Sequence, residues 1–479
     1  MRGADVVVVG YGPAGAAAAI AAHDAGRSVL VLEKTATGGG NAIHSGGFLW
    51  DAPDPAAAEH VEALTFGRTD RAVIDAYING LHALDAWLHA LGAETERFAP
   101  PPIRFPAPFP SWPHFPAGHE IAYRVVSGGE GRRGLALWDA LDAAVRERDV
   151  AVERDARATE LLRGDDGAVS GVVVGDEPIA ARGGVILACG GFEGDAGLAD
   201  AYLPLGPAWP VGHQANTGDG LRLGQAAGAA LWHMYGFFGW FAFRTPEFPA
   251  PFAIDLFAPG FLMVDADGRR FADETGYEVH DRLRALSTYL PHNPNRPRLP
   301  SWTILDGAAL AAGPLNGLLG TPNAYSWSTD NRAEVARGWV KQGRGVAELA
   351  AATGLDPTVL ATTLAEYRAA VEARRDARFH RDPETLVALD ETDLYAIETW
   401  PGVAGTTGGP RHDAAARVLD AGGSAIPGLY AAGAVSLIWG HLIDHGGGLT
   451  DALVFGRIAG EDAAQRATRA GGQTPLRVT

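Results

Sequence analysis

The sequence holds a single cysteine, Cys189, among 479 residues. One thiol forms no internal disulfide, so a disulfide-stabilised scaffold is excluded and a reducing compartment is allowed. The chain opens on the polar stretch Met-Arg-Gly-Ala-Asp and passes at once into a strand pattern, unlike a secretory signal. We therefore expect a cytoplasmic protein.

Positive charge is also scarce. Lys and Arg together number 39 against 57 Asp and Glu, the formal net charge is −18, and no run of basic residues occurs. Nucleic acids and anionic membrane surfaces attract basic patches, so we expect neither as a partner.

Uncharged stretches that are free of glycine are short. Two stretches without charge, 6–23 and 223–243, are long enough to span a bilayer, but several glycines interrupt each of them. Glycine turns between apolar segments fit buried α/β structure better, so we expect no membrane span.

The composition is otherwise that of a globular protein, with 47% apolar residues, 20% charged residues and 63 glycines. The length exceeds what one simple hydrophobic core usually organises, which indicates two domains. The many glycines indicate tight turns and places where backbone segments approach closely.

The N-terminal segment carries a nucleotide-binding motif. The β-branched run DVVVV predicts a buried strand, and it leads into GYGPAG, which places Gly10, Gly12 and Gly15 at G-x-G-x-x-G spacing. An alanine-rich helix and a second strand, SVLVLE, follow, and that strand ends in Glu33. The glycine spacing alone is weak evidence, but this order of strand, turn, helix, strand and acid predicts a Rossmann-like dinucleotide site.

Each residue of this motif has a physical role. We expect Gly10 to make the tight turn, Gly12 to let the backbone approach a pyrophosphate, and Gly15 to let helix and strand pack closely. The free N–H groups and dipole at the helix N-terminus favour the phosphates, and Glu33 is placed to accept hydrogen bonds from a ribose.

The motif alone does not separate FAD from NAD. The next stretch, EKTATGGGNAIHSGGFLW, adds a second glycine-rich loop. With this loop the sequence resembles the flavoprotein family of fumarate reductases, succinate dehydrogenase flavoprotein subunits and 3-ketosteroid dehydrogenases, in which such a loop runs beside the flavin. The resemblance implies FAD as the cofactor.

The resemblance extends over nearly the whole chain, through GGVILACGGFEGD, NTGDGLRLGQAAGA, PGFLMVDADGRRFADE, TTGGPRHDAAARVLDAGGSAIPGLYAAGAV and LTDALVFGRIAGEDAA. It implies an α/β fold with a discontinuous Rossmann-like FAD-binding domain, residues 1–247 and 397–479. An inserted α+β capping domain, residues 248–396, would close over the flavin and exclude water. Within it, SWTILDGAAL predicts a strand followed by a helix, and DPTVLATTLAEYRAAVEARRD predicts an amphipathic helix.

Motif and resemblance together assign the FAD contacts. Thr450 and the helix that follows it should lie near flavin N1 and C2=O, and Ala434 stands where many relatives carry a glutamate. Gly40 occupies the position of the histidine that binds flavin covalently in succinate dehydrogenases, so we expect non-covalent FAD. The full set of expected cofactor-binding residues is Gly10, Gly12, Pro13, Ala14, Gly15, Glu33, Lys34, Gly39, Gly40, Asn41, Ser45, Gly46, Gly47, Ala158, Gly190, Asp219, Gly433, Ala434, Gly448, Leu449 and Thr450.

The charged groups with which fumarate reductases hold a dicarboxylate are missing. The family pattern puts an arginine four residues after the glutamate that aligns with Glu274, where this chain has Glu278. A histidine position is Gly405, and HLIDHGGG contains no arginine where N-R-L-G-G carries one. A dianion left unpaired in a closed site costs several kcal/mol, so we reject fumarate and succinate as substrates.

The ketosteroid dehydrogenases are the nearer functional analogue. They hold a ketone with a tyrosine hydroxyl and a glycine N–H, remove an α-proton with a second tyrosine, and pass the β-hydride to flavin N5. The resemblance places Tyr277 at a tyrosine position of that branch and Gly446 on the glycine, whereas Leu442 stands where the ketone-binding tyrosine belongs. An oxyanion hole is expected, with an unassigned side-chain partner.

Two histidines, His441 and His445, lie in the stretch GHLIDHGGGLTD before the last helix. Imidazole titrates near neutral pH and serves as donor or base, so we expect at least one of them to face the substrate. A structural role for both, or a metal site built from them with Asp444, is the alternative, and we expect no metal.

Other polar residues offer weaker candidates. Trp112, His114, His119 and Tyr123 lie in or beside the proline-rich stretch 99–119, which we expect to form an ordered loop over the site. We expect Glu278, His280 and Asp281 at the surface of the cap. The run WHMYGFFGWFAF either packs in the core or lines an apolar cavity.

These observations indicate an FAD-dependent dehydrogenase or ene-reductase that acts on CH–CH groups. It would introduce or reduce a C=C bond next to a carbonyl on a largely apolar small molecule, with an electron partner that the sequence does not identify. Two alternatives stay open: a reductase of an unsaturated acid that uses an external electron donor, and a flavoprotein isomerase or hydratase without net redox.

Overall fold

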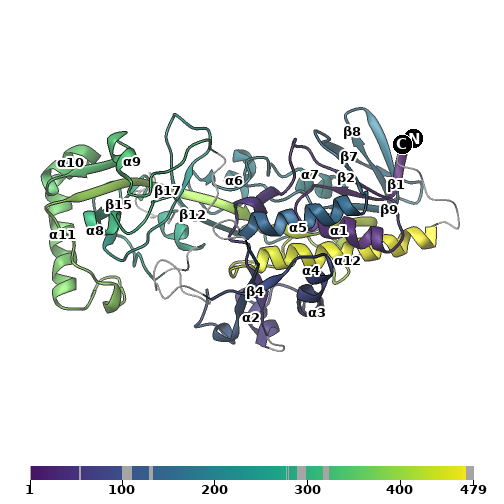
Figure 1. Ribbon diagram of the computed structural model, residues 1–479, viewed down its shortest axis with the longest axis horizontal. Helices are drawn as coiled ribbons and strands as arrows, with labels where there is room; N and C mark the ends of the chain where they lie inside the picture. Colours follow the sequence, from purple (N-terminus) through teal and green to yellow (C-terminus); the bar gives the residue numbers. More distant parts are fainter. Residues whose placement is uncertain are drawn as a thin grey trace.

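The computed structural model describes residues 2–52, 56–99, 111–128, 133–276, 278, 280–287, 298–316 and 323–470. The molecule is elongated (Figure 1), with one sheet and the helices α1, α5 and α12 in one half. A second sheet with the helices α8 to α11 forms the other half. The strands β12 and β17 run between them.

The first half is built on an eight-stranded sheet with the order β19-β20-β9-β1-β2-β6, to which β8 and β7 are joined through β9. The strand β1 is parallel to both of its neighbours, β2 and β9. The strands are β1 (Arg2–Val9), β2 (Val29–Leu32), β6 (Ala151–Glu153), β7 (Ala158–Arg163), β8 (Val169–Val174), β9 (Glu177–Leu187), β19 (Arg417–Leu419) and β20 (Ala425–Ala431). Because β19 and β20 come from the C-terminal segment, this α/β unit is discontinuous, as the sequence predicted.

The helices on this sheet pack closely because their residues are small. The helix α1 (Pro13–Asp24) buries most of its alanines, and α12 (Gly447–Ala470) lies directly against it. A Cβ added at Gly456 would lie 2.5 Å from the Ala14 carbonyl oxygen, and one at Gly460 would lie 2.3 Å from that of Ala18. Only glycine fits such a backbone approach. The third helix of this layer is α5 (Arg133–Glu147).

The second half is built on a seven-stranded sheet with the order β13-β12-β17-β15-β14, to which β10 and β16 pair through β17. The predicted strand and helix in SWTILDGAAL are β15 and α8. The predicted amphipathic helix is α11, which Asp356 caps by accepting the N–H groups of Thr358 and Val359. The elements are β10 (Trp209–Pro210), β12 (Phe237–Phe243), β13 (Phe252–Ile254), β14 (Phe261–Val264), β15 (Ser301–Asp306), β16 (Val340–Gly343), β17 (Leu394–Thr406), α8 (Gly307–Leu310), α9 (Arg332–Ala336), α10 (Val346–Thr353) and α11 (Pro357–Glu372).

The domain boundaries drawn from the sequence remain predictions. The strand β12 ends before residue 248, and β17 spans the boundary at 396/397. Both strands nevertheless belong to the second sheet, because β12 pairs antiparallel with β17.

Smaller elements complete the described chain. A three-stranded sheet has the order β3-β5-β4, and the helices α2 to α4 lie between β3 and β4 in the sequence. Two short strands, β11 and β18, form a separate pair. These elements are β3 (Leu49–Asp51), β4 (Thr95–Arg97), β5 (Ala122–Val126), α2 (Ala56–Leu64), α3 (Arg71–His82), α4 (Leu84–Ala90), α6 (Ala196–Tyr202), α7 (Asp219–Ala226), β11 (Leu231–Trp232), β18 (Gly409–Pro410) and the 3₁₀ turns η1 (Gly40–His44), η2 (Gly118–Glu120), η3 (Arg282–Ser287), η4 (Pro383–Thr385) and η5 (Gly433–Val435). Of the proline-rich stretch, residues 100–110 lie outside the described residues.

The two uncharged stretches of the sequence each divide into several elements. Residues 6–23 contain the second half of β1 and nearly all of α1, and residues 223–243 contain the end of α7 followed by β11 and β12. Within the described ranges, every helix is too short or too polar to cross a membrane.

A buried ion cluster stabilises the half of the molecule that is built on the second sheet. Glu274 accepts two hydrogen bonds from Arg270, at 2.8 and 2.9 Å, and a third from Arg381 at 3.2 Å. Arg270 also donates to Asp376 at 2.8 Å. Each charge therefore has a partner, which a charge out of contact with water requires.

We predict that Glu274→Ala lowers the free energy of unfolding by about 3–5 kcal/mol, because it leaves two buried arginines short of an anion. Urea unfolding followed by tryptophan fluorescence measures this change. The control is Asp267→Ala, which removes an exposed partner of Arg269 and should change stability by less than about 1 kcal/mol. Equal effects of the two substitutions would contradict the structural role of the cluster.

Candidate active site

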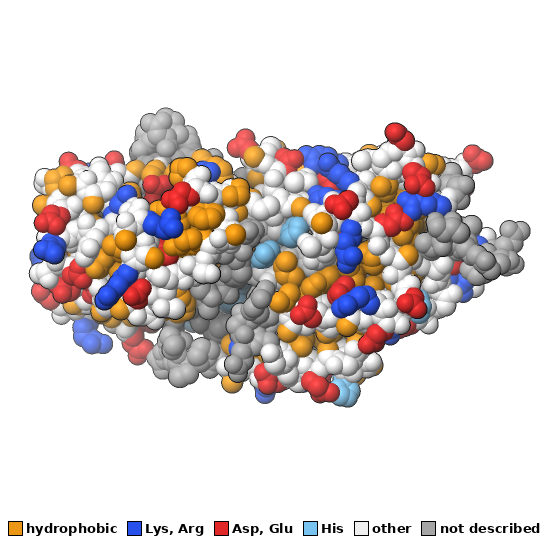
Figure 2. Space-filling model, turned by 45° about the horizontal axis from the view of Figure 1, so that its top comes forward, with side chains coloured by type: hydrophobic (Ala, Val, Ile, Leu, Met, Phe, Trp, Pro, Cys, Tyr) orange, Lys and Arg blue, Asp and Glu red, His pale blue; other side chains and the backbone are white. Residues whose placement is uncertain are grey.

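A cavity of about 650 Å³ lies at the carboxyl ends of the parallel strands. Gly10 follows β1, Glu33 follows β2, Gly190 follows β9 and Gly433 follows β20, and all four line the cavity. In open α/β sheets ligands bind at this edge. Figure 2 shows histidine and apolar side chains near the middle of one face of the molecule.

Packing within the protein requires two glycines of the first turn, whereas the third leaves space for a ligand. Gly10 has a φ of +107°, and a Cβ on Gly15 would lie 2.0 Å from the Gly10 carbonyl oxygen. A Cβ on Gly12 would meet no described protein atom closer than the Gly39 oxygen at 3.8 Å. Protein packing therefore requires glycine at positions 10 and 15, whereas at position 12 it leaves space that a pyrophosphate fits.

The carboxylate of Glu33 holds this turn in place. Its Oε2 accepts the N–H of Tyr11 at 2.9 Å, and its Oε1 accepts both the N–H and the hydroxyl of Thr35, at 2.8 and 2.7 Å. An ionised carboxylate offers about four acceptor positions, so capacity for a ribose hydroxyl remains.

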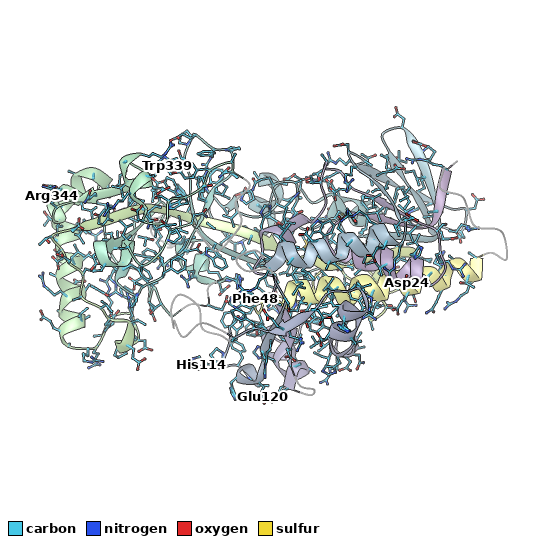
Figure 3. All side chains as sticks on the ribbon, viewed as in Figure 1. Asp24, Phe48, His114, Glu120, Trp339 and Arg344 are labelled. Atoms are coloured by element: carbon cyan, nitrogen blue, oxygen red, sulfur yellow. The ribbon has the colours of Figure 1, made fainter. Side chains whose placement is uncertain are left out.

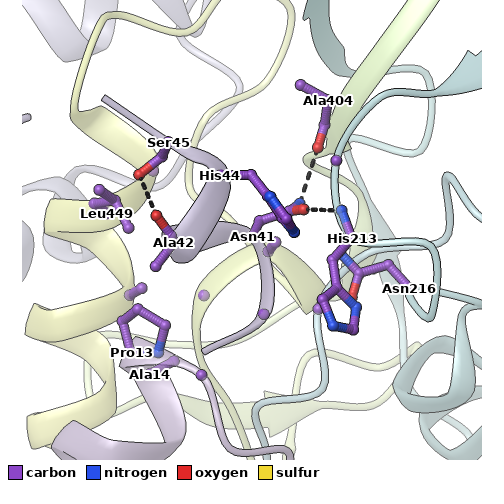
Figure 4. Close-up of a pocket in the computed structure, with 18 of the residues that line it drawn as sticks. Pro13, Ala14, Asn41, Ala42, His44, Ser45, His213, Asn216, Ala404 and Leu449 are labelled. Carbon is purple, nitrogen blue, oxygen red and sulfur yellow. Dashed lines mark hydrogen bonds between the residues drawn. The ribbon is translucent and has the colours of Figure 1, made fainter. Parts of the chain in front are cut away.

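The second glycine-rich loop contains η1 and is tied to both halves of the molecule. Asn41 donates to the Ala404 oxygen at 2.9 Å, and its own oxygen accepts the N–H of His213 at 2.6 Å (Figure 4). The Ser45 hydroxyl donates to the Ala42 oxygen at 2.8 Å. These bonds hold the loop along the cavity, beside the first turn.

A charged cluster closes the far end of the nucleotide region. Asp219 accepts hydrogen bonds from Lys34 at 3.0 Å and from Arg157 at 2.7 Å. Burial raises the pKa of Asp219, but the bonds from these two cations outweigh it, and the net pKa is lower than usual. Asp219 is therefore ionised at neutral pH.

The cavity collects most of the residues that the sequence assigned to FAD. All of them line it except Gly15, Gly39 and Thr450. The Thr450 hydroxyl accepts the N–H of Trp50 at 2.9 Å, so it anchors β3 to the start of α12. The neighbours Gly448 and Leu449 bring the helix N-terminus to the cavity wall.

The other end of the cavity is mainly apolar. The strand β12 alternates, so that Phe238 and Trp240 line the cavity while Phe237 and Phe241 pack into the core. The aromatic run of the sequence thus serves both purposes. Phe48 lies where the two halves of the molecule meet (Figure 3). The remaining apolar residues at this end are Phe98, Phe257, Leu437 and Ile443.

The two histidines of GHLIDHGGGLTD differ in position. His445 is 5% exposed and lines the cavity, where its Nδ1 contacts the Ser111 hydroxyl and lies 3.4 Å from Glu278. Burial, with the neighbouring His280, holds the pKa of His445 well below its usual value, so the ring is neutral. His441 does not line the cavity and packs beside Phe66 and Tyr235.

Gly446 also lines the cavity, with a φ of +73°. Within the described chain, its N–H makes no hydrogen bond, which suits a donor to a substrate oxygen. Tyr277 lies outside the described residues.

His280, which the sequence placed at the surface together with Glu278, reaches this end of the cavity. That expectation is wrong for Glu278, which is 4% exposed, and for His280, which lines the cavity. His280 Nδ1 lies 2.9 Å from Glu278 Oε1. The Glu-x-His spacing was the available signal, but it does not reveal that the segment folds inward against His445.

A second polar network fixes the loop that carries His445. Asp444 accepts the Tyr123 hydroxyl at 2.7 Å and faces His60 Nε2 at 3.2 Å. His60 Nδ1 lies 2.8 Å from the Pro116 oxygen. Burial, then the Asp444 charge, raises the pKa of Tyr123, so its phenol stays protonated.

Indole groups hold the same loop from both sides. Trp50 Nε1 donates to the His445 oxygen at 3.0 Å, and Trp112 Nε1 donates to the Ile443 oxygen at 2.9 Å. Of the weaker candidates, Trp112 and Tyr123 thus position the loop, while His114 and His119 are exposed.

The metal site weighed from the sequence is not assembled, because Asp444 is engaged by Tyr123 and His60 while His441 lies apart. Glu278, His280 and His445 instead bring three potential ligand atoms within 4.8 Å of one another.

We predict that Gly12→Ala weakens FAD binding by tenfold or more while leaving the folded apoprotein intact, because its methyl group enters ligand space. A tenfold change corresponds to about 1.4 kcal/mol. Gly15→Ala should instead lower the melting temperature, because its Cβ meets a carbonyl oxygen. Flavin fluorescence titration and thermal melts of the apoproteins measure both effects. Unchanged FAD affinity in the Gly12 variant would show that the cofactor lies elsewhere.

Comparison with known proteins agrees with this site. The family model of the FAD binding domain matches residues 5–450. The chain is 31% identical, over 377 residues, to 4-oxocyclohex-2-ene-1-carboxylate 5-dehydrogenase of Sinomonas cyclohexanicum, a match that covers 71% of this chain and 60% of that protein. It is 28% identical to 3-oxosteroid 1-dehydrogenase of Mycobacterium tuberculosis over 97% of this chain and 98% of the other.

Among solved structures, the fold matches a 3-ketosteroid Δ1-dehydrogenase from Sterolibacterium denitrificans with a TM-score of 0.82 and 23% identity. That match covers 97% of this chain and 100% of the other. The resemblance drawn from the sequence is confirmed.

Proposed function

The chain belongs to the FAD binding domain family and is an FAD-dependent oxidoreductase acting on CH–CH groups, and on this premise we propose that it introduces or reduces a C=C bond next to the carbonyl of a cyclic ketone. One observation carries the proposal. An apolar pocket end presents Gly446 N–H and a neutral His445 side by side, and the described residues that line it include no arginine pair for a dicarboxylate.

The residues of the nucleotide region fit FAD. The first turn and Glu33 would hold its pyrophosphate and ribose, and the second glycine loop with Gly448 and Leu449 would border its ring. When bound, FAD supplies a two-electron acceptor or donor of hydride. The absence of a histidine at Gly40 supports non-covalent binding, and acid denaturation should then release free flavin.

The chain's own groups prepare the substrate. Gly446 N–H and His445 are placed to donate to a carbonyl oxygen, which makes the neighbouring C–H bond more acidic. The aromatic wall of Phe238 and Trp240 orients a flat ring and excludes water, which strengthens these hydrogen bonds. The second sheet supplies this wall through β12, which lies just before the proposed capping domain of residues 248–396.

A single anionic group on the substrate also finds a partner. Lys34 and Arg157 both bind Asp219, so Arg133 alone among the described cavity-lining cations has no carboxylate partner. Its guanidinium lies 5.2 Å from the centre of the Phe98 ring, which packs on Phe48. This arrangement supports a cyclic ketone with one carboxylate, as named for the Sinomonas relative. It equally supports the second candidate, a reductase of an unsaturated monoacid.

The electron partner is open. The single cysteine is compatible with the cytoplasmic location that we propose.

Anaerobic mixing of the FAD-loaded protein with 4-oxocyclohex-2-ene-1-carboxylate should bleach the flavin absorbance and release 4-hydroxybenzoate, the stable tautomer of the dienone product. Fumarate should not restore the oxidised spectrum of the bleached protein, because the described residues of the cavity offer Arg133 as a single unpaired cation and not the pair that a dianion needs. Steady turnover should require an added electron acceptor. Rapid reoxidation by fumarate, or turnover of a ketone without any acceptor, would contradict the proposal.

Substituting Arg133→Met should raise KM for 4-oxocyclohex-2-ene-1-carboxylate about tenfold, which is about 1.4 kcal/mol. The same change should alter KM for the neutral cyclohex-2-en-1-one by less than about threefold, since only the carboxylate loses its partner. Steady-state kinetics with both ketones measure the difference. Equal changes for the two substrates would remove Arg133 from charge recognition.

A further inference from the structure

We propose that His280, oriented by Glu278, is the base that removes the proton from the carbon next to the substrate carbonyl. The inference rests on the proposed function for the identity of the substrate, whereas the contacts and distances that support it lie within the protein. Glu278 stands where fumarate reductases carry an arginine, and the sequence resemblance assigns no role to the position of His280.

The contacts with Glu278 determine which nitrogen of His280 carries the proton. Nδ1 lies 2.9 Å from Oε1 of Glu278, and the His280 backbone N–H donates to Oε2 at 2.7 Å. An ionised carboxylate only accepts hydrogen bonds, so Nδ1 carries the proton. Nε2 of the neutral ring is then left with its lone pair, as a base requires.

Glu278 is buried near a cation. Its side chain is 1% exposed, and Glu278 and Asp255 both act on the charge of the buried Arg282. Burial lowers the pKa of Arg282 to about 10, while Glu278 and Asp255 act in the opposite direction. Arg282 is therefore a cation at neutral pH.

The position of His280 matches the task. Its ring centre lies 4.3 Å from that of His445 and 5.1 Å from that of Trp240, and all three residues line the cavity. A ketone whose oxygen lies at Gly446 and His445 therefore has its neighbouring carbon within reach of His280. Of the described residues, none makes a hydrogen bond to Nε2.

The other titratable groups at this end are less suited to the task. His445 has a strongly lowered pKa and its Nδ1 faces Ser111 and Glu278. Tyr123 has a raised pKa and donates to Asp444, whose second oxygen faces His60. Among the groups at this end that the structure describes, His280 combines a fixed proton on Nδ1 with an open position at Nε2.

The proposed step is balanced. The C–H bond next to the carbonyl breaks toward His280 Nε2, and its electron pair enters an enolate whose oxygen Gly446 and His445 hold. Bound oxidised FAD would accept the hydride from the next carbon while the enolate returns to the ketone and its C=C electron pair forms the new double bond. The substrate thereby loses one proton and one hydride, which together are two protons and two electrons. In the reducing direction, protonated His280 returns the proton to the same carbon.

The test compares His280→Gln and Glu278→Gln in the FAD-loaded protein. A matched control is His89→Gln, which alters an exposed histidine 3.0 Å from Glu94. The first readout is the rate of flavin bleaching by cyclohex-2-en-1-one with and without deuterium at its saturated α-carbon. His280→Gln should slow bleaching 100-fold or more, raise the isotope effect, and change the substrate affinity by less than threefold. Glu278→Gln should slow bleaching less than His280→Gln does. The control variant should match the wild type.

The second readout needs no turnover. 4-Nitrophenol mimics the enol, and at a pH where the free phenol is neutral it should bind to the wild type as the yellow phenolate, with its proton on His280. It should bind to His280→Gln as the neutral phenol.

The two readouts separate the two proposals. A wild type that bleaches with the ketone, beside a His280→Gln variant that keeps both the rate and the phenolate band, overturns the role of His280 alone. Phenolate binding without bleaching by any cyclic ketone contradicts the proposed function and leaves the base in place. Loss of both signals after treatment with a chelator would indicate a metal ion at Glu278, His280 and His445 and overturn the proposal.

Discussion

The direct packing of α12 on α1 determines where the chemistry takes place. Gly456 and Gly460 bring the two backbones into contact, and a side chain at either position would meet a carbonyl oxygen of α1. Because α1 starts at the first glycine turn, α12 must start beside the same turn. The helix N-terminus and the loop 443–446 are thereby held at the cavity, although they lie at the opposite end of the sequence from β1.

Some polar groups around the cavity fix its walls, and others are proposed to react with the substrate. Glu33 holds the first turn, Asp219 holds Lys34 and Arg157, and Asp444 holds Tyr123 against the loop of His445. Each of these carboxylates accepts hydrogen bonds from protein groups, as a buried polar group requires, and Glu33 keeps capacity for a ribose hydroxyl. The reacting end then offers an apolar wall, one free N–H and two imidazoles, a set that suits a ketone.

The sequence predicted the elements whose signals are local. The strand, turn and helix of β1 and α1 follow from a β-branched run, three glycines and a run of alanines. For the aromatic run of β12 the sequence leaves core packing and cavity lining both open. The structure was needed wherever two distant segments meet. The sequence predicts a surface position for Glu278 and His280 because nothing nearby in the sequence shows that His445 lies against them. His441 and His445 are indistinguishable in the sequence, since contacts with distant segments, such as the bond from Trp50 to the His445 oxygen, bring only His445 to the cavity.

The central claim is that a substrate carbonyl lies at Gly446 and His445, with the adjacent carbon facing His280. A crystal structure of the FAD-loaded protein with bound 4-nitrophenol tests it most directly. The account predicts the phenol oxygen within hydrogen-bond distance of the Gly446 nitrogen and a His445 ring nitrogen, and the ring between Trp240 and the flavin with one edge toward His280 Nε2. A phenol oxygen that contacts neither group, or a ring bound away from His280, would contradict it.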